Sequence, residues 1–147
     1  PWSVVVGNTL SLNATYLHAV ADRLQAGATN LNGFSLPNSP NWSVATFYEH
    51  AFDLQNGAQI RANANFKYTG SRWTLYNHQV GSDQDASTRT DVSLGYYAAG
   101  DSWSVRAWGR NLEDSLEKLT CANALPGPTG CTFGQPRTFG ASISFKY

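Results

Sequence analysis

Two cysteines, three histidines and a pair of aspartates are the side chains of this sequence with the most scope for chemistry. Cys121 and Cys131 bracket a short segment rich in Gly and Pro. In an exported protein, an even pair of cysteines in a loop predicts a disulfide. Free thiols or half of a metal site are the alternatives, and the lack of a nearby histidine argues against zinc. Such a disulfide would pin an extracellular loop, with a stabilisation of about 2–3 kcal/mol in the chain-entropy model.

The histidines do not form a recognisable site. His18, His50 and His78 lie on three separate segments, and their spacing gives no reason to expect them to converge on a metal or a substrate. We expect isolated structural or surface histidines. Asp83 and Asp85 give only a weak calcium signal, so a solvated loop is the better interpretation. No nucleophile-elbow, zinc-protease or phosphate-loop motif is present, so the sequence predicts neither an enzyme nor a cofactor.

Composition limits the class of protein. The chain has 147 residues, enough for one domain, and a formal charge of zero, which gives no electrostatic footprint for nucleic acid. Charged residues make up 14% and aromatic residues 13%, whereas about a quarter of a typical globular domain is charged. A transmembrane β-barrel and a secreted β-sandwich both share this balance. No apolar run is long enough for a transmembrane helix, and the start at Pro1 suggests a piece of a longer exported protein.

The elements that would position these residues are β-strands. In residues 137–147, apolar side chains alternate strictly with small or polar ones, which predicts a strand with one apolar face. The apolar set is Phe139, Ala141, Ile143, Phe145 and Tyr147. Further strands are expected at residues 2–6, 9–22, 42–52, 58–69, 88–97 and 102–111.

The connections alternate in length. Tight turns are predicted at Gly7-Asn8, Asn56-Gly57 and residues 98–101, and long loops at residues 25–41, 70–87 and 112–136. Short turns at one rim and long loops at the other are typical of an outer-membrane barrel. A strand of about eleven residues, tilted near 45°, climbs about 25 Å, which matches the apolar band of such a barrel. Six strands and a remnant leave two open sheet edges, which are costly in lipid. Either further chain supplies the missing strands of the barrel, or the molecule is a small barrel with one more strand that the sequence pattern does not reveal.

The polar faces of the strands have two interpretations. Arg61, Asn63, Asn65 and Lys67 share one face of one strand, and Arg106 and Arg110 share a face of another. These side chains would line the solvated outside of a sandwich or the lumen of a barrel. The alternating loop lengths favour the lumen.

Aromatic residues near the predicted strand ends are expected to form interfacial girdles. This set comprises Trp42, Trp73, Trp103 and Tyr147. For Trp73, with its neighbours Arg72 and Tyr76, contact with a ligand is the alternative.

Three stretches together resemble a known family. They are LPNSPNWS at residues 36–43, SVRAWGRNLED at residues 104–114 and PRTFG at residues 136–140. Each is weak alone. In this order, ending in an aromatic residue, they resemble the C-terminal part of a TonB-dependent outer-membrane receptor over essentially the whole chain.

The resemblance implies a bacterial outer-membrane location and a barrel of about twenty-two antiparallel strands around an N-terminal plug. It implies uptake of a scarce large ligand, commonly an iron-siderophore and sometimes cobalamin or a glycan. The TonB complex would supply the energy through a TonB box. Residues 1–147 would be the last six or seven strands of the barrel, without plug or TonB box, in contact with lipid and lipopolysaccharide. Phe139, Ile143, Phe145 and Tyr147 would carry the C-terminal signal read by the barrel assembly machinery.

Two other classes stay open. One is a small structural or adhesion-type outer-membrane barrel that transports nothing, and the other is a secreted β-sandwich binding module. The length of the parent chain would separate the receptor from the small barrel. Extraction without detergent would identify the soluble module.

Overall fold

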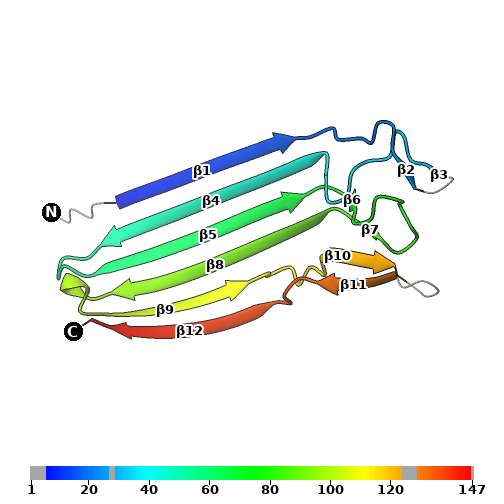
Figure 1. Cartoon of the computed structure of the whole chain (residues 1–147). Coiled ribbons are helices and arrows are strands. Elements are labelled where there is room, and N and C mark those ends of the chain that lie inside the picture. Colours follow the sequence, from blue (N-terminus) through cyan, green and yellow to red (C-terminus); the bar gives the residue numbers. More distant parts are fainter. Residues whose placement is uncertain (1–5, 27–28, 124–128, 147) are drawn as a thin grey trace.

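The protein is described by a computed structural model over residues 6–26, 29–123 and 129–146. Its main element is one antiparallel sheet of six strands in the order β1-β4-β5-β8-β9-β12 (Figure 1). The strands are β1 (Val6–Tyr16), β4 (Trp42–Asp53), β5 (Gln59–Thr69), β8 (Ser87–Tyr97), β9 (Trp103–Arg110) and β12 (Thr138–Phe145). The predicted all-β, antiparallel class is therefore confirmed. The one helical element of the described residues is the short η1 (Ala99–Asp101).

The register keeps each face of the sheet uniform. Leu12 of β1 lies opposite Thr46 of β4, which lies opposite Phe66 of β5, which lies opposite Thr90 of β8. Because successive side chains of a strand point to opposite faces, this alignment places every second residue of each strand on the same face across the sheet.

Two short connections lie at one end of the sheet. Between β4 and β5, Gly57 has φ 76°, and the Asn56 side chain accepts a hydrogen bond from the backbone N–H of Ala58 at 3.1 Å. Between β8 and β9, η1 contains Gly100 with φ 67°. Both predicted turns are confirmed, and both depend on glycine because the left-handed region is costly for residues with a Cβ.

The turn predicted at Gly7-Asn8 is wrong. Both residues belong to β1, where Gly7 lies opposite Ala51 and Asn8 lies opposite His50. Pairing along the whole of β4 holds this segment extended, which overrides the local turn preference of the dipeptide. The separate strand expected at residues 2–6 lies outside the described residues, except for Val6, which begins β1.

The three long connections lie at the opposite end of the sheet from the short turns (Figure 1). They match the long loops predicted at residues 25–41, 70–87 and 112–136, and each contains a two-stranded antiparallel hairpin that the sequence did not predict. The hairpins are β2 (Gln25–Ala26) with β3 (Thr29–Asn30), β6 (Arg72–Trp73) with β7 (Asp83–Gln84), and β10 (Lys118–Asn123) with β11 (Thr129–Phe133).

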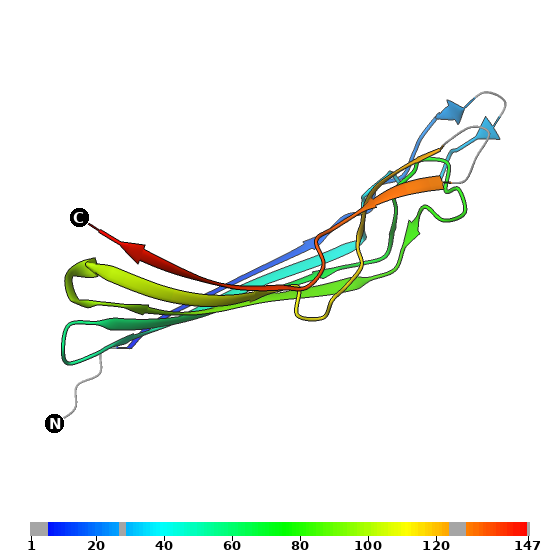
Figure 2. The same cartoon turned by 90° about the horizontal axis from the view of Figure 1, so that it is seen from below.

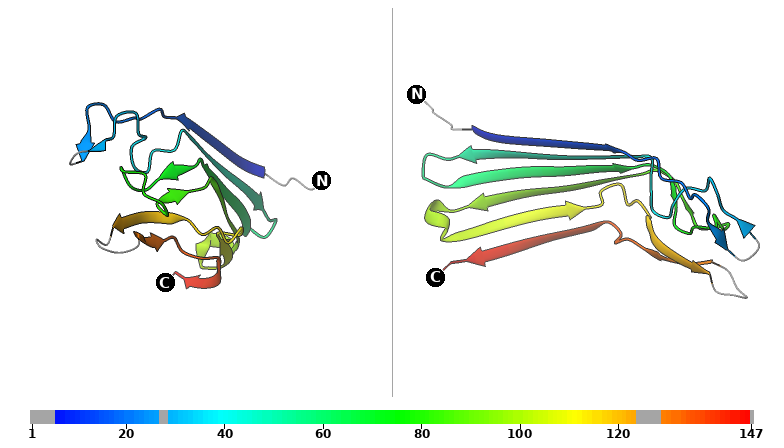
Figure 3. Two further views of the ribbon diagram at one scale, coloured as in Figure 1. Left: turned by 90° about the vertical axis from the view of Figure 1, so that its right-hand side faces the viewer. Right: turned by 45° about the horizontal axis from the view of Figure 1, so that its top comes forward.

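The six-stranded sheet is a single curved layer (Figures 2 and 3). Within the described ranges, no second layer covers either face, and the buried apolar residues are few and peripheral. They are Ala21, Leu31, Ala58 and Cys121. The outer edges of β1 and β12 have no partner strand in the part of the chain that is described, so the sheet is open.

Candidate functional site

The two faces of the sheet differ completely in charge. Eight charged side chains occur in the six strands, and the register places all of them on one face, here named the polar face. They are Glu49, Asp53, Arg61, Lys67, Arg89, Asp91, Arg106 and Arg110. Asn63 and Asn65 share this face, so the six residues predicted to line a lumen lie together.

The opposite face, here named the apolar face, is covered by exposed apolar side chains. Leu10 is 69% exposed, Phe139 70% and Phe145 66%, values unusual for large apolar residues in a folded domain. Small residues form its centre. A hollow of about 530 Å³ lies there, with Ala64 and Ala107 in its floor.

Aromatic side chains gather toward both ends of the apolar face. At the long-connection end, Tyr16 and Trp42 are in contact, with ring centroids 5.0 Å apart. Near the short-turn end, Tyr96 and Trp103 are in contact at 5.2 Å. The polar side chain of His50 also lies toward this end and contacts the ring of Phe52 at 3.9 Å.

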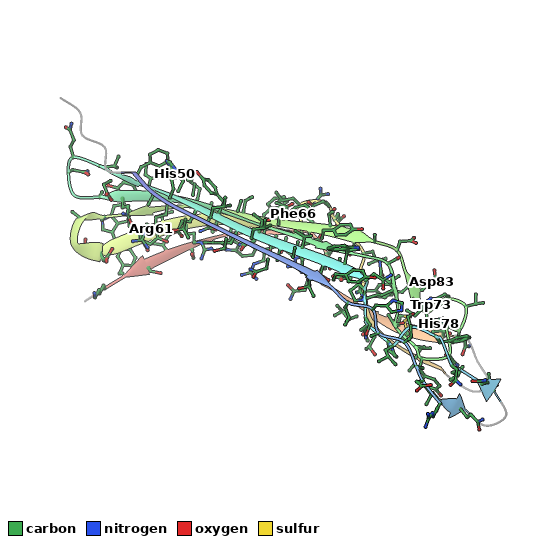
Figure 4. The ribbon with its side chains drawn as sticks, turned by 90° about the horizontal axis from the view of Figure 1, so that it is seen from above. His50, Arg61, Phe66, Trp73, His78 and Asp83 are labelled. Atoms are coloured by element: carbon green, nitrogen blue, oxygen red, sulfur yellow. A yellow bond between two sulfur atoms is a disulfide. The ribbon has the colours of Figure 1, made fainter. Side chains whose placement is uncertain are left out.

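Trp42 and Trp103 lie toward opposite ends of the apolar face, whereas Trp73 lies outside the six-stranded sheet. Trp73 belongs to β6 in the loop layer beyond the sheet, next to His78 and Asp83 (Figure 4). The ring of His78 is stacked between those of Phe34 and Trp73, with both centroid distances at 4.5 Å. His78 Nε2 also contacts the backbone oxygen of Ser35 at 3.1 Å. Packing between two long connections therefore accounts for Trp73 and His78.

Hydrogen bonds order the centre of the polar face. The Ser93 hydroxyl donates to Asn63 Oδ1 at 2.9 Å, and Nε of Arg106 donates to the Ser93 oxygen at 3.0 Å. Arg89 forms an ion pair with Asp91 at 3.2 Å. Since Asn63 lies on β5, Ser93 on β8 and Arg106 on β9, this chain of contacts crosses three strands.

Two arginines of the polar face stack on aromatic rings. The guanidinium carbon of Arg61 lies 4.9 Å from the centre of the Tyr97 ring, and that of Arg110 lies 4.7 Å from Trp108. Each ring lies against a glycine. A Cβ on Gly95 would be 2.9 Å from the Tyr97 ring, and a Cβ on Gly140 would be 2.3 Å from the Trp108 ring.

A matching contact occurs on the apolar face. Phe139 lies over Gly109, where a Cβ would be 2.9 Å from the Phe139 ring. Gly140 is opposite Trp108, and Phe139 is opposite Gly109. Each of the two strands, β9 and β12, therefore contributes one aromatic residue and one glycine to these two neighbouring pairs. The WGRNLED and PRTFG motifs therefore contact each other, and their glycines are required by the rings that cover them.

Asn111 closes the end of β9. Its φ of 52° lies in the left-handed region, which Asn tolerates better than most residues, and it is 2% exposed. Its backbone N–H donates to Asp91 Oδ1 at 2.8 Å, and its amide contacts the backbone of Ser115 and Gln135. These bonds join β8, the end of β9 and the segment that leads into β12.

The β8–β9 pairing ends at Val92 and Gly109, and beyond this point the Glu113 side chain bonds to the backbone of β8. The Glu113 carboxylate accepts hydrogen bonds from the Thr90 N–H at 2.7 Å and from the Thr90 hydroxyl. Burial alone would raise the pKa of Glu113, but these hydrogen bonds outweigh it and hold the pKa below its usual value. From the same turn, the carboxylate of Asp114 accepts the N–H of Arg137 at 2.8 Å.

The long connections are joined to one another. Arg72 in β6 donates to Glu117 at 2.8 Å and to the backbone oxygen of Lys118 at 3.2 Å, and its side chain is only 6% exposed. Cys121 and Cys131 lie opposite each other in the β10–β11 hairpin and are joined by a disulfide. Arg72, which the sequence offered as a ligand contact, is thus occupied by an ion pair between connections. Tyr76 is exposed in the β6–β7 connection.

Metal chemistry gains no support from the described ranges. No three His, Cys, Asp or Glu side chains there gather in positions that could hold a metal ion. Asp83 and Asp85 lie near each other at the end of β7, and both are exposed.

No helix among the described residues is long and apolar enough to cross a membrane.

Of the proposed C-terminal signal, Phe139, Ile143 and Phe145 lie together on the apolar face, whereas Tyr147 lies outside the described residues.

Comparison with protein families, with curated proteins and with solved structures found no match for this chain.

Proposed function

We propose that this chain forms part of the wall of a TonB-dependent receptor in the bacterial outer membrane, with the apolar face toward lipid and the polar face toward the lumen. The observation that carries this proposal is the separation of charge. The polar face holds every charged side chain of the six strands, while the apolar face has none and is exposed. Lipid is the surrounding in which an exposed apolar face without a charge is stable.

The dimensions of the sheet support the same proposal. β1, β5 and β8 each have 11 residues and β4 has 12, which gives a climb of about 25 Å at a tilt near 45°. Aromatic pairs toward both ends of the apolar face suit the two interfaces of a bilayer. The open edges of β1 and β12 would pair with further strands of a barrel of about twenty-two, because unpaired backbone groups are costly in lipid.

In this proposal the protein takes up a scarce large ligand, such as an iron-siderophore, with energy from the TonB complex. The motifs at residues 36–43, 104–114 and 136–140 support the receptor family. Their contacts give these residues a structural role, since the last two motifs fix β9 against β12. Insertion would depend on the barrel assembly machinery.

The face assignment is tested by a pair of variants at neighbouring positions of β5. Ala62→Arg places a charge at the centre of the apolar face and should cost about 2–4 kcal/mol in a bilayer, so the yield of folded, membrane-inserted protein should fall sharply. Asn63→Arg, on the polar face, should leave that yield nearly unchanged. Equal yields for the two variants would refute the assignment.

Transport is tested in the bacterium that produces the protein. Deletion of the gene should abolish energy-dependent uptake of one iron complex, cobalamin or glycan, and deletion of the TonB complex should have the same effect. An inserted barrel without TonB-dependent uptake would instead identify a structural or adhesion-type barrel. A protein that is released without detergent would identify a secreted binding module.

A further inference from the structure

We infer that the polar face carries an anion-binding site centred on Arg106 and Arg110, with a carboxylate- or phosphate-bearing small molecule as its ligand. A cavity of about 300 Å³ lies on this face, across β5, β8, β9 and β12. Arg89, Arg106 and Arg110 line it, and Asp91 is the one acidic residue among its lining side chains. The inference rests on the proposed function only in placing this cavity toward a lumen.

The two central guanidinium groups approach the same row of the sheet from opposite directions. In that row, Ser93 of β8 lies opposite Trp108 of β9. Arg106 reaches it from the short-turn side through the hydrogen bond of its Nε to Ser93 at 3.0 Å. Arg110 reaches it from the long-connection side, where its guanidinium lies 4.7 Å from the centre of the Trp108 ring.

The contacts that hold these arginines leave most of their donors free. The guanidinium of Arg110 is positioned by stacking on the face of the Trp108 ring. The structure records no hydrogen bond from the guanidinium N–H groups of Arg110 to any described residue. Arg106 uses Nε on Ser93, so both Nη groups keep their donors. A positioned guanidinium with free N–H groups matches the paired oxygens of a carboxylate or phosphate.

Asp91 is the one carboxylate in the cavity lining, and its charge acts on Arg110 as well as on Arg89. Within the described residues, neither Arg106 nor Arg110 forms an ion pair. Asp91 is engaged by Arg89 at 3.2 Å and by the backbone N–H of Asn111 at 2.8 Å. The register neighbours of Arg106 are Gly95 and Ser142, which carry no charge. Three guanidinium groups with one carboxylate leave an excess of positive charge in this cavity, and an anion between Arg106 and Arg110 reduces their mutual repulsion.

The site also contains its own reporter. The Trp108 ring is part of the cavity lining and lies beneath the guanidinium of Arg110. An anion that draws Arg110 away from the ring, or settles beside it, should change the fluorescence of this tryptophan. Trp108→Phe keeps an aromatic surface under Arg110 and removes the signal.

The test uses the intact protein in detergent, titrated separately with citrate and with inorganic phosphate at an ionic strength held constant with sodium chloride. We expect saturable quenching or enhancement with at least one of the two anions, and the comparison shows whether carboxylate or phosphate is preferred. Arg106→Gln and Arg110→Gln should each weaken binding on the order of ten- to a hundredfold. Raising the salt concentration should weaken it as well.

Lys67→Gln is the matched control, because it removes a positive charge from the polar face outside the cavity. Binding in this variant should stay within about twofold of the unchanged protein. Equal weakening in all three variants would mean a diffuse electrostatic field and would overturn the site. The absence of a saturable signal with both anions, or an identical signal in Trp108→Phe, would also overturn it.

Circular dichroism of each variant should show an unchanged sheet, so that a binding defect is separated from misfolding. The test is also independent of the membrane proposal. A protein released without detergent that still binds citrate through Arg106 and Arg110 would disprove the barrel and keep the anion site. If Ala62→Arg impairs insertion and Asn63→Arg does not, but no anion binds, the face assignment stands and the anion site is disproved.

Discussion

The Trp108 ring lies so close to Gly140 that a Cβ on the glycine would be 2.3 Å from a ring carbon. Trp108 and Gly140 are direct register partners of β9 and β12, and Gly109 and Phe139 are the adjacent pair. A strand displaced by one residue would bring each ring against a side chain in place of a glycine. The two pairs therefore fix the register of the last strand.

Gly140→Ala should destabilise the protein by about 1–3 kcal/mol, because the added methyl group must displace the Trp108 ring. The measurement is the midpoint of thermal unfolding in detergent. Ser142→Ala, on the same face of β12, is the control and should have little effect. A double variant with Trp108→Ala should recover part of the loss. An additive loss in the double variant would contradict the contact.

Stability should depend on pH through Glu113. Hydrogen bonds from Thr90 keep its pKa in the folded protein below that in the unfolded chain. The stabilisation is therefore fully present above the unfolded value of about 4.3, and it is lost as the pH falls through the lower, folded value. Between about pH 5 and pH 3, the unfolding midpoint should fall. Glu113→Gln should flatten this part of the profile, and an equally steep profile in this variant would contradict the role of Glu113.

Breaking the Arg72–Glu117 pair should loosen the long connections. Glu117→Gln leaves the guanidinium of Arg72 buried and without its carboxylate, and such a loss costs about 3–5 kcal/mol when the pair is fully buried. Because Glu117 is 23% exposed, we expect the lower end of that range or less. Hydrogen exchange should rise in β6–β7 and β10–β11 and stay constant in β4 and β5. A uniform rise in hydrogen exchange across the six-stranded sheet would show that the effect of breaking the pair is not local.

Loss of the disulfide should also act locally. Removal of the Cys121–Cys131 bond by a double substitution to Ser should cost about 2–3 kcal/mol in the chain-entropy model. The β10–β11 hairpin pairs only within itself, outside the six-stranded sheet. Faster hydrogen exchange should therefore be confined to β10–β11 and to the β6–β7 connection, where the Gly81 and Asp83 carbonyls accept hydrogen bonds from Lys118 Nζ. An equal effect on β9 and β12 would contradict this arrangement.

Most of the sheet could be predicted from period-two alternation. Residues 58–69 and 137–147 alternate so regularly that their strands and faces follow directly. Gly7-Asn8 misled the prediction because its turn preference is local, whereas its pairing with Ala51 and His50 depends on β4, some forty residues away in the chain.

The contacts within the candidate site could not be predicted from the sequence for a similar reason. Arg106 and Arg110 were recognisable as neighbours on one face. Their convergence on the row of Ser93 and Trp108 depends on the register between β8 and β9 and on the direction in which each long side chain bends. The hairpins in the long connections have strands as short as two residues, too short for a periodic pattern. Asn111 could have been suspected, since Asn directly after a strand favours a left-handed turn.

The two ends of the sheet should differ in how they tolerate insertions and deletions. One residue added at Leu54–Ala58 would shift β5 relative to β4 by a single position and turn every side chain of one strand to the opposite face. The connections that carry β2–β3, β6–β7 and β10–β11 can change length while both flanking strands keep their register. Among natural variants of this protein, length differences should therefore gather at the end that carries the long connections, while the strands of the six-stranded sheet keep their lengths.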